Sequence, residues 1–297
     1  MSGTRSPAPA PVWRLADRSL RLDRPVVAGI LNVTPDSFSD GGRYLDPVRA
    51  AERAFEMVEA GAGLIDIGAE STRPGAQPVD TDAEWSRLAD VLDRLSDLPV
   101  PISIDTMKAG VAERALDRGA VAINDVSGGR DPALVDVAAR RGAGLVLMHM
   151  RGNPRTMQRD TEYADVVSDV RDALSAARDA AIHAGCEPET IAVDPGLGFG
   201  KSVEGNLELI ARLDELTRIG APLWIGPSRK SFLGKLMDCA VEDRLEGTIA
   251  TCVAALARGA RVFRVHDVGP VCRALGVAWA VERAATPGVT AGGGGRA

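Results

Sequence analysis

The sequence lacks the features that mark membrane-spanning, secreted and nucleic-acid-binding proteins. No apolar run approaches the ~20 residues that a helix needs to cross a bilayer, and the N-terminal MSGTRSPAPAP has no hydrophobic signal segment. The 4 cysteines are widely spaced with no CxxC pair, which indicates neither a disulfide framework nor a thiolate metal site. The net charge is −6 and no dense Lys/Arg run occurs, which argues against nucleic-acid binding. We therefore expect a soluble, cytoplasmic protein with no nucleic-acid or membrane partner.

The composition is otherwise that of an ordinary globular chain. Of its 297 residues, 45% are hydrophobic and 26% are charged, so the chain can bury a large core, and disordered and fibrous classes are excluded. The length alone leaves open either two domains or one large α/β barrel with tails.

Short β-type runs alternate with amphipathic segments eight times along the chain. Several amphipathic segments end in a glycine, such as Gly61, Gly119 and Gly142, that can take the left-handed conformation that closes a helix. Apolar strands joined by crossover helices predict a parallel sheet covered by helices. Eight such units favour a closed (β/α)8 TIM barrel over the alternative, an open doubly wound sheet. The predicted strands are residues 26–31, 64–68, 101–105, 120–125, 144–149, 190–194, 222–226 and 261–266, and the predicted helices are 47–60, 82–95, 107–118, 132–141, 163–184, 202–219, 245–258 and 268–284.

The segments outside this alternation complete the predicted domain organisation. WRLADRSLRL (13–22) is typical of a small hairpin that could plug the N-terminal mouth of the barrel. Residues 1–11 and 286–297 are rich in Pro and Gly, and we expect disordered tails there. A single barrel over residues 12–285 is the prediction.

The ends of the predicted strands carry almost only polar residues. Active sites of such barrels lie at the C-terminal ends of the strands, so these residues should converge. A single polar strand end can simply meet solvent, but carboxylates, amides and cations at eight positions favour a site. The residues are Asn32, Asp66, Asp105, Asn124 with Asp125, Met148 with His149, Asp194, Ser228 with Arg229 and Lys230, and Arg264 with His266.

The cations and the first amide point to an anionic ligand. Arg229 and Lys230 follow the seventh strand, and Arg264 and His266 end the eighth, where barrels of this kind commonly hold phosphate. Asn32 offers an amide oxygen suited to Mg2+, because this ion usually takes few protein ligands and fills its remaining positions with substrate phosphates and water. The alternative role of Asn32 is to cap a turn.

The two carboxylates and the amide at the ends of three strands point to a heterocyclic ligand. Asp105, Asn124 and Asp194 should face the barrel mouth, where buried carboxylates need donor-rich partners such as the amide and amino edges of a planar ring. The loops 33–43 and 69–78 are long enough to fold over a second substrate, although they could also be plain connectors.

Taken together, the motifs resemble those of the dihydropteroate synthases of the pterin-binding barrel family. The resemblance runs from about residue 26 to 275 and includes all eight strand ends in order. The motifs are ILNVTPDSFSDGG, DIGAESTRPGA, SIDTMK, INDVSGG, LMHMRG, DPGLGFGKSVEGN, GPSRKSFLG, RLEGTIA and RVHDV.

The resemblance implies a step of folate biosynthesis, transfer of a 7,8-dihydropterin-6-ylmethyl group from its pyrophosphate ester to p-aminobenzoate. Catalysis would rest on Asp105, Asp194, Lys230 and Arg264. The pterin would be bound by Asp105, Asn124, Met148, Asp194, Lys230 and Arg264, the pyrophosphate by Asn32, Arg264 and His266, and Mg2+ by Asn32. The p-aminobenzoate pocket would be formed by Phe38, Thr72, Arg73, Pro74, Phe199, Lys230 and Ser231.

The resemblance also implies a homodimer, plausibly through the last helices, where the apolar ALGVAWAV could equally pack on the barrel. Inhibition by sulfonamides, which mimic p-aminobenzoate, is a further implication. For the chemistry we expect a dissociative, SN1-like substitution. Two alternative functions remain, a non-catalytic pterin-binding homologue and a methyltetrahydrofolate-dependent corrinoid methyltransferase.

Overall fold

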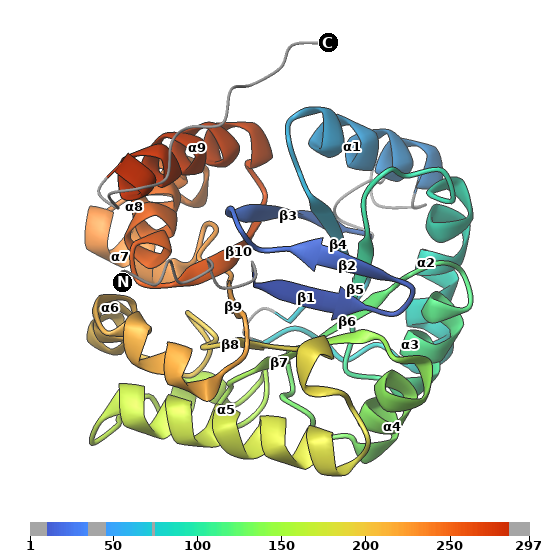
Figure 1. The fold of residues 1–297 in the computed structure, drawn as a ribbon, viewed down its shortest axis with the longest axis horizontal. Coiled ribbons are helices and arrows are strands. Elements are labelled where there is room, and N and C mark those ends of the chain that lie inside the picture. The colour runs from blue at the N-terminus through green and yellow to red at the C-terminus, as the bar shows by residue number, and fades with distance from the viewer. Residues whose placement is uncertain (1–10, 35–45, 73–74, 285–297) are drawn as a thin grey trace, which may run out of the picture.

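The computed structural model describes residues 11–34, 46–72 and 75–284, and its centre is a closed barrel of parallel strands (Figure 1). Each barrel strand pairs with the next in chain order, and the last pairs with the first. The predicted eight-stranded α/β barrel is therefore confirmed. Its strands are β3 (Val26–Asn32), β4 (Leu64–Gly68), β5 (Ile102–Asp105), β6 (Ala122–Asp125), β7 (Gly144–Met148), β8 (Ile191–Asp194), β9 (Leu223–Ile225) and β10 (Ala260–Val265).

Both faces of the barrel strands are buried, which explains why their sequences are apolar without alternation. On β4, Ile65 packs outward against the helices, whereas Leu64 belongs to a separate cluster inside the barrel. On β7, Leu145 and Val146 divide in the same way. Alternate residues of each strand therefore point into the barrel.

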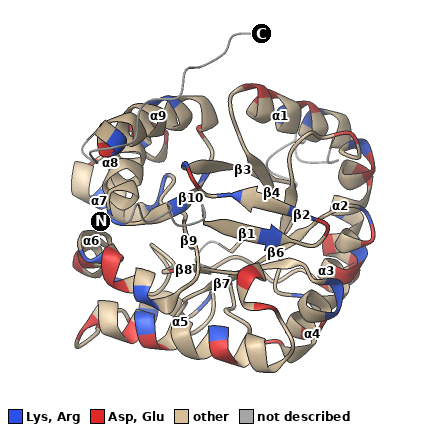
Figure 2. Cartoon of the chain, in the orientation of Figure 1, with Lys and Arg blue, Asp and Glu red and all other residues tan. Residues whose placement is uncertain are grey.

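Helices surround the barrel on its outside (Figure 1). Several begin at an aspartate whose side chain accepts hydrogen bonds from amides of the first turn, as Asp46, Asp80, Asp131 and Asp165 do. Figure 2 shows charges of both signs spread along these outer helices. The helices are α1 (Pro47–Glu59), α2 (Thr81–Arg94), α3 (Ala109–Leu116), α4 (Pro132–Arg141), α5 (Val166–His183), α6 (Val203–Ala211), α7 (Ser231–Met237), α8 (Leu245–Leu256) and α9 (Val268–Ala284), with short 3-10 helices η1 (Met157–Arg159), η2 (Pro188–Thr190), η3 (Leu213–Ile219) and η4 (Val241–Asp243).

An antiparallel hairpin, β1 (Val12–Leu15) and β2 (Arg18–Arg21), covers one mouth of the barrel. Trp13 is fully buried inside the barrel cluster, where its ring meets that of Trp224 edge to face at 5.6 Å. Its indole Nε1 donates to the carbonyl of Thr190 at 2.7 Å. The predicted plug is confirmed. Because the hairpin closes this mouth, a ligand would bind at the opposite mouth of the barrel.

Two helical predictions differ from the structure. Residues 202–219, predicted as one helix, form α6 and then η3, because the backbone at Arg212 leaves the α-helical conformation. The seven-residue helix α7 was too short for its periodicity to show. The predicted tails lie outside the described residues except for Pro11, so their disorder stays a prediction. Within the described ranges, no helix has both the length and the apolar composition needed to cross a membrane.

Candidate active site

The inward-facing residues of the barrel change from apolar to polar along each strand. Ala122 and Ala192 belong to the apolar cluster below, and Asn124 and Asp194 follow two residues later on the same face. Because the strands are parallel, these polar ends meet at the mouth opposite the hairpin. The inward strand-end residues are Asn32, Asp66, Asp105, Asn124, Met148, Asp194 and Arg264.

Arg264 lies at the centre of this mouth and joins two carboxylates. Its Nε donates to Oδ2 of Asp66, and its Nη2 donates to Oδ2 of Asp105 at 2.7 Å. The amide Nδ2 of Asn124 donates to the same Asp66 oxygen at 3.1 Å. All four side chains are largely buried, so each charge is held by a partner rather than by solvent.

Burial also sets the protonation of the two carboxylates expected to meet the pterin. It raises the pKa of Asp105 to about 7, with Asp66 adding to the rise and Arg264 opposing it. It raises the pKa of Asp194 to about 6, against the amide of Gly196, which donates to Asp194 Oδ1 at 2.7 Å. The mouth therefore holds two carboxyls whose protonation changes near neutral pH.

The side of the mouth expected to bind pyrophosphate carries less free positive charge than the sequence indicates. Arg229 donates to both oxygens of Asp267, at 3.0 and 2.7 Å, so this guanidinium is already paired. Burial and the nearby Arg264 lower the pKa of His266 to about 3, so its ring is neutral. The His266 Nδ1 lies 2.9 Å from the hydroxyl of Ser228. A neutral imidazole can still donate to a phosphate oxygen.

Lys230 and Phe199 meet on the other side of the mouth. The ammonium of Lys230 lies 4.0 Å from the centre of the Phe199 ring. Phe199 is buried in an apolar cluster that also contains Met148. Lys230 directly precedes Ser231, the first residue of α7. Lys230, Phe199 and Met148, which belong to the expected pterin and p-aminobenzoate sets, therefore lie together.

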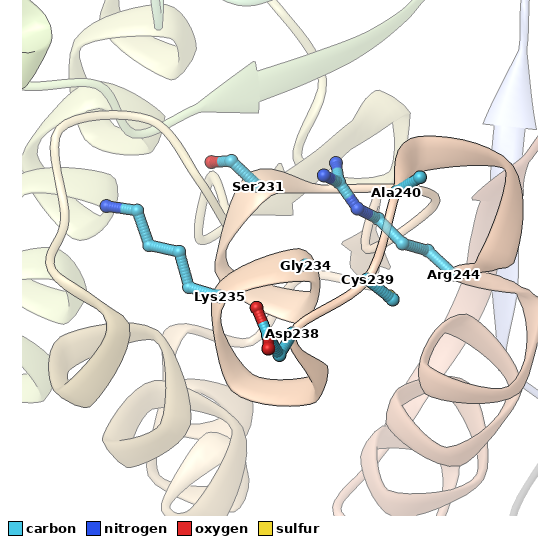
Figure 3. A pocket seen from close by; sticks show the side chains of 7 residues that line it. All are labelled: Ser231, Gly234, Lys235, Asp238, Cys239, Ala240 and Arg244. Atoms are coloured by element: carbon cyan, nitrogen blue, oxygen red, sulfur yellow. The ribbon is translucent and has the colours of Figure 1, made fainter.

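Ser231 also lines a cavity of about 570 Å3 between α7 and the segment that follows it, up to Arg244. The guanidinium of Arg244 lies over the turn of α7 that contains Gly234, where a side chain larger than hydrogen would collide with it (Figure 3). None of the strand-end groups of the mouth lines this cavity. The lining residues are Ser231, Gly234, Lys235, Asp238, Cys239, Ala240 and Arg244.

Part of the predicted p-aminobenzoate pocket cannot be placed. Phe38, Arg73 and Pro74 lie outside the described residues, and Thr72, just before the gap, is half-buried. Of the loop 33–43 the structure describes only residues 33 and 34, and of the loop 69–78 all residues except 73 and 74. Their roles stay predictions.

The residues around Asn32 fit a magnesium ion held mainly by a substrate. Asn32 ends β3 beside Gly68 of β4 and is half-buried at the rim of the mouth. Among the described residues, no group of three His, Cys, Asp or Glu side chains is arranged to bind a metal. One amide oxygen suits Mg2+ when phosphate and water supply the remaining ligands.

Three features of the mouth were absent from the predicted binding and catalytic sets, although Asp66 was already predicted to lie at the mouth as a strand-end residue. Asp66 is the second carboxylate on Arg264, and its position in DIGAES was the available signal. Lys108 binds Glu70 and the fully buried Glu84, at 2.6 and 2.5 Å. Lys201 is a buried lysine beside Asp194. Asp66, Lys108 and Lys201 are all part of the quoted motifs, but only the fold shows which side chains they contact.

The chain resembles known proteins throughout the barrel. Residues 28–266 match the family described as pterin binding enzyme. A dihydropteroate synthase of Synechocystis sp. is 47% identical over 262 residues, which cover 86% of this chain and 91% of that protein.

Solved structures agree in fold. The Xanthomonas albilineans dihydropteroate synthase with 4-aminobenzoic acid has a TM-score of 0.86 and 42% identity, covering 92% of this chain and 98% of that one. The Yersinia pestis dihydropteroate synthase in a sulfonamide complex has a TM-score of 0.87 and 39% identity, covering 92% and 99%. The likeness thus includes the strand ends that form the mouth.

Proposed function

Because the chain belongs to the pterin-binding enzyme family, among its dihydropteroate synthases, we propose that its barrel mouth joins 6-hydroxymethyl-7,8-dihydropterin pyrophosphate to p-aminobenzoate. The products are 7,8-dihydropteroate and pyrophosphate, and the step belongs to folate biosynthesis. The observation that carries the assignment of the site is the buried set of Asp105, Asn124 and Asp194 beside Arg264 and Lys230. It provides acceptors for a donor-rich ring next to cations for an anionic group.

The pterin is proposed to lie against β5, β6 and β8. Asp105 and Asp194 would accept hydrogen bonds from its amino and amide groups, and Asn124 can both donate and accept. Arg264 would flank the ring, and Met148 would contact it from β7. The burial of Asp105 and Asp194 supports this arrangement, because a buried carboxylate gains most from a ligand that donates to it.

The p-aminobenzoate is proposed to lie between Phe199, Lys230 and Ser231. The Phe199 ring gives an apolar face for the benzene ring, and Lys230 and the Ser231 end of α7 face its carboxylate. Thr72 would border the pocket together with Phe38, Arg73 and Pro74. The 4-aminobenzoic acid complex of the Xanthomonas relative supports this class of second substrate.

The substitution is proposed to be dissociative. The aniline nitrogen is a poor nucleophile, so the C–O bond to pyrophosphate breaks before the C–N bond forms. The methylene cation is delocalised into the dihydropterin, and the fixed charges of Asp105 and Asp194 stabilise it. The electron pair leaves with pyrophosphate, which Arg264 and a hydrogen bond from His266 would stabilise, and the amine gives up a proton after the attack. Exclusion of water from the mouth would protect the cation.

Asn32 would hold Mg2+, whose positive charge offsets part of the charge on the leaving pyrophosphate. The half-buried amide at the rim supports this role.

The proposal is tested by incubating the protein with the pterin pyrophosphate and Mg2+, with and without p-aminobenzoate. We expect pyrophosphate release together with a product of the mass of dihydropteroate. Pterin binding without release would instead indicate a non-catalytic homologue. Methyl transfer from methyltetrahydrofolate to a corrinoid protein, with no synthase activity, would indicate the alternative enzyme class.

Sulfonamides are expected to compete with p-aminobenzoate. They resemble it in shape and charge, and the Yersinia relative is known in a sulfonamide complex. Initial rates at several p-aminobenzoate concentrations should show a sulfonamide raising KM and leaving kcat unchanged. A fall in kcat with an unchanged KM would place the inhibitor elsewhere.

A homodimer through the last helices is also proposed. Within ALGVAWAV, Leu275 is buried on the barrel, whereas Val277 and Val281 of α9 are 67% and 65% exposed. These valines are four residues apart and therefore lie on one face of the helix. Sedimentation at several concentrations should show a dimer that Val277→Glu weakens. A monomer at all concentrations would contradict the proposal, as would a dimer unchanged by Val277→Glu.

A further inference from the structure

Lys201 is a buried lysine whose hydrogen bonds go to carbonyls and an imidazole. It is 4% exposed, and Asp194 is the nearby carboxylate that favours its charge, but no ion pair within 4.0 Å joins Lys201 to a carboxylate among the described residues. Its ammonium lies 3.0 Å from the carbonyl of Gly196, 2.9 Å from that of Phe199, and 3.0 and 3.4 Å from Nδ1 and the carbonyl of His149. Burying an ammonium is costly, and an apolar side chain of similar volume could fill the same space. The position therefore uses the donors of the ammonium.

These acceptors join the loop after β7 to the loop between β8 and α6. Gly196 and Phe199 are both in this loop, and the ammonium bridges their carbonyls across its bend. His149 belongs to the neighbouring loop after β7. Burial and the charge of Lys201 lower the pKa of His149 to about 3, so its ring is neutral and can accept from the ammonium. Lys201 thus joins two loops of the mouth.

This loop supports the side chain of Lys230. The Phe199 ring lies 4.0 Å from the Lys230 ammonium. Gly198, with a φ of +80°, lies under the Lys230 stem, since a Cβ on Gly198 would come within 3.1 Å of the Lys230 Cδ. The same loop also supplies the Gly196 amide to Asp194 at 2.7 Å.

We propose that Lys201 is a positioning residue for the transfer reaction, which holds the β8–α6 loop in the shape that seats Lys230 on Phe199 and so orients the p-aminobenzoate. This inference rests on the proposed function. Lys201 acts through the loop and does not touch the reacting atoms.

Other side chains also bind this loop, among them Asn206, and two neutral donors, Tyr163 and Gln158, provide a matched control. The hydroxyl of Tyr163 donates to the carbonyl of Gly200 at 2.9 Å, and Gln158 Nε2 donates to that of Gly198 at 3.1 Å. Both are neutral, and neither bonds the Phe199 carbonyl. Tyr163→Phe therefore removes one hydrogen bond to the loop and leaves the hydrogen bonds of the Lys201 ammonium in place.

The test compares Lys201→Met with wild type and Tyr163→Phe. For Lys201→Met we expect KM for p-aminobenzoate to rise about tenfold and kcat to fall, because a misplaced second substrate loses both binding and orientation. Affinity for the pterin should fall less than affinity for p-aminobenzoate, since Asp105 and Asn124 lie outside the loop and only Asp194 and Lys230 of the pterin set contact it. Tyr163→Phe should keep KM within about threefold.

A double-mutant cycle with Phe199→Leu identifies the route. If Lys201 acts through Phe199, then adding Lys201→Met to Phe199→Leu raises KM for p-aminobenzoate by much less than it does in wild type. Additive effects would overturn the proposal. So would a Lys201→Met variant whose KM stays within about twofold of wild type and whose kcat falls only with the folded fraction.

Two outcomes are kept apart from these. If wild type forms no dihydropteroate, the proposed function fails and this inference with it, whereas an active wild type with an unchanged variant overturns only the role of Lys201. Should Lys201→Met not fold, the double variant Gln158→Leu, Tyr163→Phe removes the two neutral donors and leaves the Lys201 hydrogen bonds to the loop. Its KM for p-aminobenzoate should stay within about threefold of wild type. A tenfold rise there would overturn the proposal.

Discussion

At the scale of single residues, the charge available in the mouth depends on how Arg264 divides its N–H donors between Asp66 and Asp105. One carboxylate, Asp66, is fully buried and has no direct opening to the mouth, whereas Asp105 lies at the end of β5, 8% exposed. Both are bound to the same guanidinium. The charge of Asp105 is thus the one available to a ligand, and that of Asp66 mainly holds Arg264.

Asp105→Asn tests this division. It is nearly isosteric and removes the charge proposed to stabilise the methylene cation, so kcat should fall by about 100-fold or more. Affinity for the pterin, measured by direct binding, should fall much less. Asp66→Asn is the control, because it also releases Arg264 but lies deeper. An Asp105→Asn enzyme with kcat within about twofold of wild type would show that the charge is not used.

The raised pKa values of Asp105 and Asp194, about 7 and about 6, predict a pH dependence. If the reaction needs both ionised, kcat/KM for the pterin substrate falls as the pH drops from about 8 to about 5.5. The contribution of these two carboxyls to stability has the opposite sign. Between about pH 4 and 7 they hold protons in the folded chain that they have released in the unfolded chain, so their share of the free energy of unfolding decreases as pH rises. His149 and His266, whose pKa values are lowered to about 3, contribute in the other direction between about pH 3 and 6.5. A flat kcat/KM profile would contradict the assignment.

At the scale of elements, a buried ion cluster ties three segments of the mouth together. Lys108, three residues after Asp105, binds Glu84 of α2 and Glu70 of the loop after β4. The other oxygen of Glu70 accepts from the amide of Val79 at 2.9 Å and so closes the base of that loop. The element that carries Thr72 is therefore anchored to the strand that carries Asp105.

Lys108→Met should destabilise the protein by about 3 kcal/mol, because it leaves the fully buried Glu84 charged and unpaired. Arg114→Met is the matched control. It breaks the pair with Asp82, which joins the same two helices at the surface, and should cost less than about 1 kcal/mol. Urea unfolding gives both values. Equal losses would mean that burial of the cluster contributes nothing.

The sequence predicted the elements well where local pattern decides them. The strand over 64–68 and the helices over 132–141 and 268–284 end at the predicted residues. The break at Arg212 was missed because residues on both sides keep a helical period. The pairing of Arg229 with Asp267 was missed because it joins residues far apart in the chain, and only the closed barrel brings them together.

At the scale of the whole molecule, the two mouths of the barrel have different tasks. The hairpin mouth is sealed by Trp13 and its apolar partners, and the other holds the charged groups. Stability and chemistry are therefore separated along the barrel axis.

Trp13→Ala should accordingly destabilise the fold by about 3 to 5 kcal/mol, because it opens a cavity under the hairpin. The KM and kcat of the folded fraction should stay close to those of wild type. Val12→Ala, at a neighbouring position that is 44% exposed, should cost less than about 0.5 kcal/mol. Thermal unfolding and initial rates check both variants. A large change in KM for Trp13→Ala would show that the two mouths are coupled.

The hairpin also sets the order in which the chain can be completed during synthesis. It precedes every barrel strand in the chain, yet Trp13 bonds to a carbonyl 177 residues further along, and β10 must still meet β3 before the barrel closes. Until then the nascent chain exposes an apolar lumen and unpaired strand edges, which favour aggregation. A segment near the start of the described chain is thus among the last to be buried.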